Sequence, residues 1–195
     1  MGRYGMGETL PEDGRIAALL PTYTSEGDAT RLLLVTGEEV LLGVRRRRVL
    51  EVLAARHCQS LVLLRQWGGH RVSGKNALAL AMAPELVLLP LRVRIPKVRG
   101  DATLGFINVA LGDVELHPTE AGTELLLPSG QRLASLWQLT TVRRHLIAAR
   151  LLAHQKADEV TRIFFRRFQG VGTRVVPEGR KNAEIAPLSS KKGTS

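Results

Sequence analysis

Short apolar runs separated by turn residues fill most of the chain, a pattern typical of β-strands. The predicted strands cover residues 16–20, 31–35, 40–44, 61–64, 86–89, 91–95, 104–109, 114–116, 123–127 and 131–136. Pro90 interrupts one apolar stretch, and because proline lacks the N–H of a ladder hydrogen bond, we expect an edge strand or a bend there. Two hairpins are predicted, around residues 36–39 and around the Pro-Ser-Gly turn at 128–130.

The apolar period changes from strand-like to helical in two segments. A short helix is expected near residues 45–57, and a long one after residues 135–138, which match a capping box. The long helix is predicted from the helical spacing of Leu139, Val142, Leu146, Ala149 and Ala153, and it should run toward Phe168. Strands come first and a long helix closes the chain, so we expect an α+β fold with a mostly antiparallel sheet.

The chain has 195 residues, 44% of them hydrophobic, which is enough for one core without disulfide or metal support. We expect a flexible N-terminal arm at 1–14, a single α+β DNA-binding domain at 15–168, and a basic disordered tail at 169–195. A lone cysteine, the lack of a signal-peptide pattern and the lack of an 18-residue apolar run predict a cytoplasmic protein that does not enter membranes.

The residues give little support for catalysis or for a metal. Residues 69–76 nearly match a phosphate-binding P-loop, but Asn76 stands where Ser or Thr should ligate magnesium, and Pro84 interrupts the helix that should follow. Cys-x-x-Cys, His-Glu-x-x-His and the dinucleotide fingerprint are absent from the sequence. We therefore expect no catalytic residues, no cofactor and no metal.

Arginine dominates the charge. The chain carries 28 basic and 18 acidic residues, a formal net charge of +10, with 22 Arg among the basic ones. Arginine binds phosphate through two hydrogen bonds and can enter a narrow, A/T-rich minor groove. The basic residues cluster at 45–48, at 92–99 and at 143–150. Arg92 and Arg94 alternate with apolar neighbours, so both should face one side of a strand, and together the clusters predict binding to nucleic acid.

Several stretches in order resemble the ComK family of competence transcription factors. They are Trp67-Gly68-Gly69 with Gly74-Lys75, Leu88-Leu89-Pro90, Phe106-Ile107, Thr123-Glu124-Leu125 with Ser129-Gly130-Gln131, and the start of the last helix. The resemblance covers roughly residues 31–152. It implies a self-associating transcriptional activator of DNA-uptake genes that binds A/T-rich promoter DNA, largely through the minor groove.

The resemblance points to two segments as DNA contacts. Arg71, Lys75 and Asn76 lie in the glycine-containing segment, and Arg92 and Arg94 follow the proline. Their assignment to DNA rests on charge and placement, and we extend it on the same ground to Lys97 and Arg99. A second copy of the chain, RNA polymerase and a protease adaptor are further candidate partners.

Three other hypotheses remain open at this point. A LytTR-like, sheet-based DNA-binding domain has a strand–hairpin–helix order that resembles residues 104–150. A basic interaction module could bind an acidic protein without nucleic acid. An enzyme could use residues 69–76 to hold a phosphorylated ligand.

Overall fold

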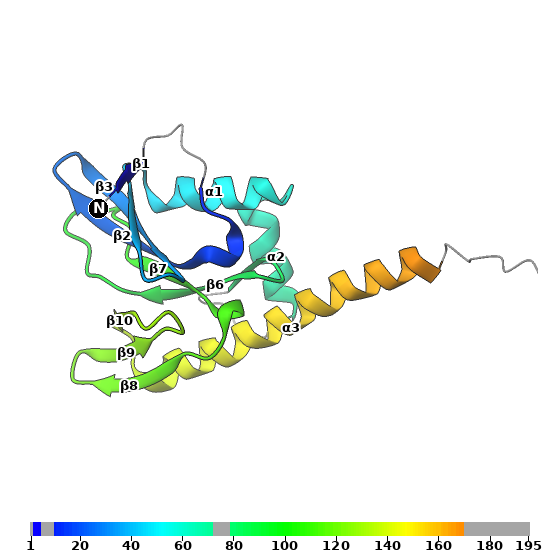
Figure 1. Ribbon diagram of the computed structural model, residues 1–195. Coiled ribbons are helices and arrows are strands. Elements are labelled where there is room, and N and C mark those ends of the chain that lie inside the picture. The colour runs from blue at the N-terminus through cyan, green and yellow to red at the C-terminus, as the bar shows by residue number, and fades with distance from the viewer. Residues whose placement is uncertain (1, 5–9, 72–78, 170–195) are drawn as a thin grey trace, which may run out of the picture.

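The computed structural model describes residues 2–4, 10–71 and 79–169 (Figure 1). Its strands are β1 Gly2–Tyr4, β2 Ile16–Thr24, β3 Gly27–Leu34, β4 Glu39–Leu42, β5 Leu80–Ala83, β6 Leu86–Arg92, β7 Leu104–Asn108, β8 Glu115–Thr119, β9 Gly122–Leu126 and β10 Arg132–Ser135. Its α-helices are α1 Arg46–Arg56, α2 Leu61–Arg71 and α3 Leu139–Gln169, and two short 3-10 turns cover Asp13–Arg15 and Val109–Leu111.

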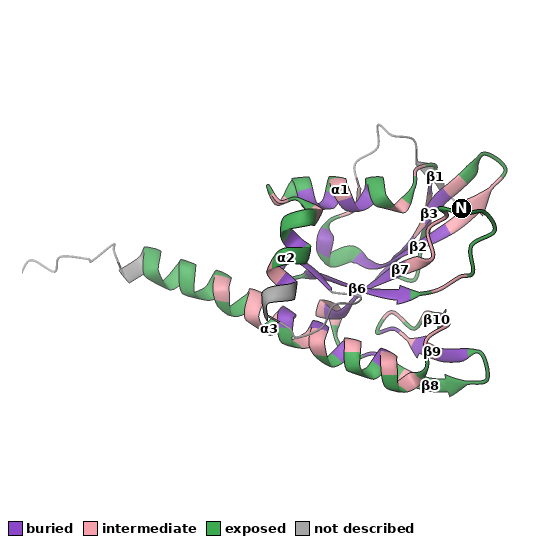
Figure 2. Cartoon of the chain, turned by 180° about the vertical axis from the view of Figure 1, so that it is seen from behind, coloured by how far each residue is buried: buried purple, intermediate pink, exposed green. Residues whose placement is uncertain are grey.

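The strands form two sheets. The larger has seven strands in the order β1-β4-β3-β2-β7-β6-β5, and its neighbours pair antiparallel except for β1 and β4, which run parallel. The smaller sheet has the order β10-β9-β8 and is antiparallel. Helices α1 and α2 lie on one side of the large sheet, and α3 with the small sheet lies on the other (Figures 1 and 2). The α+β prediction, with its short and long helices, is confirmed.

Strand β6 separates two hydrophobic cores. Val87, Leu89 and Leu91 pack on the side of α3, whereas Leu86 and Leu88 pack on the side of α1 and α2. All five side chains are completely buried. Burial on both faces explains why the segment reads as a continuous apolar run without polar alternation. The side of α1 and α2 is called the α1 face below.

The prediction of a strand at 61–64 is wrong, because these residues open α2. The Ser60 hydroxyl accepts a hydrogen bond from the Leu63 N–H at 3.3 Å, and the Leu64 N–H donates to the Ser60 carbonyl at 3.0 Å. These contacts are those of a serine N-cap. A four-residue apolar run cannot by itself distinguish a strand from the first turn of a helix.

The prediction at Pro90 is also wrong, since β6 runs through it between β5 and β7. Pro90 pairs with Phe106 of β7, but β5 ends its pairing opposite Leu88. The proline therefore lies where only one neighbouring strand needs hydrogen bonds, and the missing N–H costs little.

The predicted capping box at 135–138 is not formed, although the long helix itself is confirmed. Ser135 ends β10, its hydroxyl accepts from the Trp137 N–H at 3.2 Å and donates to the Arg92 carbonyl at 3.3 Å, and α3 begins at Leu139. The serine thus joins the small sheet to the end of β6 instead of capping α3.

Residues 10–13 are attached to the end of α1. Asp13 is only 8% exposed, and it accepts a hydrogen bond from Arg56 Nη1 at 2.8 Å and contacts His57 Nε2. Arg56 also donates to the carbonyls of Pro11 at 2.7 Å and Leu10 at 3.0 Å. The segment expected to be an N-terminal arm thus contains these contacts and β1. The tail expected at 169–195 lies, apart from Gln169 at the end of α3, outside the described residues.

None of the helices in the described part of the chain has the length and apolar character needed to cross a membrane.

Candidate nucleic-acid interface

Two arginine clusters that are distant in the sequence meet on the α1 face. Leu86 and Leu88 of β6 face α1, and the strand period of two places Pro90, Arg92 and then Arg94 on the same side. The run 45–48 opens α1 directly above that face. The segment after β6 and the first turn of α1 therefore lie side by side.

Arg46 joins the two clusters. Its Nη1 donates to the carbonyl of Leu104 on β7, and its guanidinium carbon lies 5.1 Å from the centre of the Phe106 ring. Burial, together with the nearby charges of Arg65 and Arg94, lowers the pKa of Arg46 to about 10, and the Asp28 carboxylate opposes this shift. The buried Nε of Arg46 has no hydrogen-bond partner among the described residues. The guanidinium groups of Arg46, Arg65 and Arg94 thus lie close enough on the α1 face for their charges to affect one another.

Arg94 is held tightly by its surroundings. Its Nη2 pairs with Asp28, its Nε donates to the Ala102 carbonyl at 2.6 Å, and its guanidinium carbon lies 4.0 Å from the Tyr23 ring centre. Only 13% of its side chain is exposed. The sequence predicts a direct DNA contact for Arg94, but this geometry suits a residue that shapes the loop after β6.

Tyr23 fixes the same loop from the opposite direction. Its hydroxyl donates to Asp101 and accepts from the Lys97 N–H at 3.0 Å. The hydrogen bond to Asp101 raises the pKa of Tyr23 and lowers the pKa of Asp101. The Lys97 ammonium lies 4.8 Å from the centre of the Tyr23 ring. These contacts hold residues 97–101 against β2.

The remaining predicted contacts of this segment are exposed. Arg92, Lys97 and Arg99 all have exposed side chains, and no ion pair joins any of them to a carboxylate within the described ranges. They could therefore contact phosphate without first breaking an ion pair.

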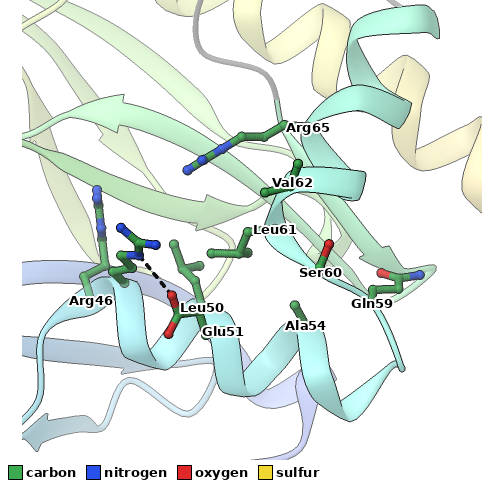
Figure 3. Close-up of a pocket in the computed structure, with 10 residues that line it drawn as sticks. Arg46, Leu50, Glu51, Ala54, Gln59, Ser60, Leu61, Val62 and Arg65 are labelled. Carbon is green, nitrogen blue, oxygen red and sulfur yellow. Dashed lines mark hydrogen bonds and ion pairs between the residues drawn. The ribbon is translucent and has the colours of Figure 1, made fainter.

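Helices α1 and α2 enclose a cleft of about 560 Å³ next to these cations (Figure 3). Arg46 and Arg65 border it, and Figure 3 shows Arg65 extending from α2 toward the first turn of α1. Arg47, 84% exposed, pairs with Glu51 at 2.9 Å. Leu50 and Leu61 are among the apolar residues lining the cleft. The cleft is thus cationic at one end and apolar in the middle.

The structure does not bring all the predicted cations together. Lys75 and Asn76 fall outside the described residues, and Arg71 is the last residue of α2. Arg143 and Arg144 are exposed on α3, across the sheet from the α1 face. The 143–150 cluster is therefore separate from the other two.

Two parts of the interface were missed by sequence reasoning. Arg65 follows the apolar run that was taken for a strand, so nothing in the sequence placed it beside α1. The run 45–48 was noted as a cluster without being included among the site residues. The sequence feature that could have indicated this run is the presence of four cations at the N-terminus of a helix, where they interact unfavourably with the positive end of the helix dipole. An anionic partner would offset that unfavourable interaction.

The chemistry of the site is electrostatic. No group of three or more metal-ligating side chains occurs within the described residues. Comparisons with protein-family models, with curated proteins and with solved structures gave no match.

Proposed function

We propose that this chain binds double-stranded DNA through the α1 face and acts as a transcriptional regulator. The observation that supports it is the position of Arg46, which contacts Leu104 and Phe106 of β7 and borders one cleft with Arg65, so that the first turn of α1 lies beside the segment after β6. Such a surface attracts the phosphate backbone and releases counterions when it binds. The net charge of +10 adds a long-range attraction of the same sign.

The exposed cations form two groups, one suited to contacts with phosphate and the other to insertion into the minor groove. Arg45, Arg47 and Arg48 project from the first turn of α1 and suit phosphate contacts. Exposed ion pairs such as those of Arg47 and Arg48 with Glu51 are weak, so exchanging Glu51 for a phosphate costs little. Arg92 and Arg99, at the end of β6 and in the loop beyond it, suit insertion into a narrow minor groove.

The resemblance to the ComK family supports the finer part of the proposal. It favours an activator of DNA-uptake genes that prefers A/T-rich promoter DNA. Binding through arginine side chains from a sheet and a loop is compatible with minor-groove recognition, which needs no recognition helix. Because DNA is the proposed partner, we also propose that the chain works in the cytoplasm.

A mobility-shift titration with paired A/T-rich and G/C-rich duplexes of equal length tests the proposal. We expect tighter binding to the A/T-rich duplex and a steep loss of affinity as salt rises. Absence of binding at low salt would contradict the whole proposal, and equal affinity for both duplexes would contradict the minor-groove preference. If the α1 face instead binds an acidic protein, a pulldown will recover that protein unchanged after nuclease treatment.

A further inference from the structure

The cleft between α1 and α2 has the size of a small-molecule site. Its volume of about 560 Å³ falls in the range of roughly 300–1,000 Å³ that is usual for ligand pockets. Arg46, Leu50 and Ala54 line it from α1 at intervals of four residues, so one ridge of that helix follows the cleft (Figure 3). Leu61 and Val62 line it from the start of α2. The middle of the cleft is therefore an apolar surface shared by two helices.

The ridge of α1 sets the length of a chain that the cleft can hold. Residues 46 and 54 are separated by eight positions, which is about 12 Å along a helix axis. An extended carbon chain advances roughly 1.2 Å per bond, so about ten carbons span this distance.

Two guanidinium groups border one end of the cleft. Arg46 and Arg65 lie close enough for their like charges to repel, and neither has an ion pair with a carboxylate among the described residues. Arg46 donates through Nη1 to the Leu104 carbonyl, but its Nε is buried without a partner in the described part of the chain. A carboxylate at this end would offset the repulsion and accept charge-assisted hydrogen bonds from both groups.

The one carboxylate that lines the cleft does not take this place. Glu51 pairs with Arg47 at 2.9 Å and with Arg48 at 3.9 Å, so its charge is offset by the outer arginines of α1. At the other end of the cleft, the buried Oε1 of Gln59 also lacks a hydrogen-bond partner among the described residues. Buried polar atoms normally have partners, so two unpaired ones on residues that line the same cleft indicate a ligand site.

We propose that this cleft binds a small carboxylate that carries one unbranched apolar chain of about ten carbons. The carboxylate binds Arg46 and Arg65 at the cationic end. The chain lies between the two helices against Leu50, Leu61 and Val62. Val62 is 62% exposed without a ligand, so the chain buries apolar surface that the fold leaves open.

This inference goes beyond DNA binding and does not depend on it. If the proposed function also holds, the bound carboxylate offsets positive charge on the α1 face, and the ligand should then weaken DNA binding. Ligand binding can be measured without DNA, so the two proposals can fail separately.

The first test is a calorimetric titration of the full chain with sodium decanoate, below the concentration at which decanoate forms micelles. We expect saturable binding to one site. Octanoate should bind about fifteenfold more weakly, because each buried methylene group contributes about fourfold to the affinity. Dodecanoate should gain much less than fifteenfold over decanoate, because its last carbons extend beyond the cleft. Absence of saturable decanoate binding, or an affinity that rises equally at every step of chain length, would overturn the proposal.

Two further probes separate the head group from the chain. Acetate has the same carboxylate without the chain, and decyltrimethylammonium has a chain of the same length with a positive head group. Neither should bind measurably. Acetate binding as tightly as decanoate would show that the cleft attracts any anion, and equal binding of the cation would remove the role of the arginines.

Substitution of Arg65 tests the carboxylate end. Arg65→Ala should weaken decanoate binding about tenfold or more, because a hydrogen bond to a charged group is lost. The matched control is Arg99→Ala, which removes another exposed arginine that does not line the cleft. Equal losses in both variants would mean that decanoate responds to net charge, and the assignment of this site would be wrong.

Two neighbouring residues of α2 provide a control for the apolar part. Val62 and Leu63 are each 62% exposed, but only Val62 lines the cleft. Both lie in the first turn of α2, where an added carboxylate interacts favourably with the helix dipole, so both aspartate variants should fold. Val62→Asp should abolish decanoate binding, since it places a carboxylate against the chain, whereas Leu63→Asp should bind decanoate like the unmodified chain. The same affinity in both variants would overturn the proposal.

Discussion

Replacing Arg45, Arg47 and Arg48 together with alanine removes the exposed charges of the first turn of α1. The fold should survive, because the latter two side chains are 84% and 63% exposed and Arg45 makes no capping hydrogen bond. Alanine is also the better helix former, and removing cations from a helix N-terminus relieves an unfavourable interaction with the dipole. We therefore expect an unchanged or slightly raised melting temperature.

The expected effect on DNA binding follows from counterion release. Each phosphate contact contributes about 0.9 to the slope of log K against log salt, so losing three contacts lowers the slope by about 2.7. Over a roughly fourfold rise in salt, the unmodified chain should lose about 40-fold more affinity than the triple variant. A fluorescence-anisotropy titration at several salt concentrations measures both slopes.

The control removes the same charge from the other side of the sheet. Arg132, Arg143 and Arg144 are exposed there, and their triple alanine variant should change the slope little. Equal slopes for the two triple variants would refute the reasoning, because binding would then follow net charge and not the α1 face.

Three further substitutions test the small sheet, the end of α1 and the loop after β6. Gly122 has φ +148°, and a Cβ there would lie 2.2 Å from a backbone oxygen of β10. Gly122→Ala should therefore lower the free energy of unfolding, measured with urea, by about 3 kcal/mol. The control Gly130→Ala should lower it by only about 1 kcal/mol, because the space around Gly130 is open. Asp13→Asn should lower stability by about 1–3 kcal/mol, since it leaves the guanidinium at the end of α1 without its buried partner, and an unchanged unfolding midpoint would contradict this. In an ultraviolet titration, Tyr23 should ionise above the ordinary tyrosine pKa, because its hydrogen bond to Asp101 holds the hydroxyl proton in the folded state. The stability contributed by this raised pKa is therefore lost as the pH rises through it. Asp101→Asn should return the pKa of Tyr23 toward 10.

Local chemistry made parts of the fold predictable from the sequence. The hairpin of β9 and β10 follows from its Pro-Ser-Gly turn, where Gly130 adopts φ +78°. The long helix follows from the helical spacing of Leu139, Val142, Leu146, Ala149 and Ala153, a signal that is too long to arise from a strand. In contrast, α2 was missed because its sequence contains Gly68 and Gly69, which weaken helical propensity, and because its apolar run is short. Packing of Leu64, only 4% exposed, outweighs that weakness.

The candidate site was predictable only where it follows strand periodicity. The side on which Arg92 lies follows from the alternation of β6, but nothing local indicates that residue 46 returns beside residue 94. That return depends on the path of the chain through β3, β4 and the turn into α1, which no local pattern specifies. Arg92 and Arg94 lie on the same side of the strand, but Arg92 is exposed and Arg94 is largely buried. The burial of Arg94 likewise depends on a residue that is distant in the sequence, Asp28, with which it pairs.

The burial of Arg94 changes how the positive charge of this face should be counted. A cation that is 13% exposed and paired with Asp28 adds little to the potential outside the molecule, because its partner cancels its charge at close range. It nevertheless anchors the loop that presents Lys97 and Arg99, through the ring of Tyr23 and the Ala102 carbonyl. Exposed arginines therefore supply the charge that DNA would meet, and the buried one supplies their position. Substituting the exposed arginines should therefore reduce the salt dependence of DNA binding. Substituting Arg94 should instead disorder the loop that presents Lys97 and Arg99.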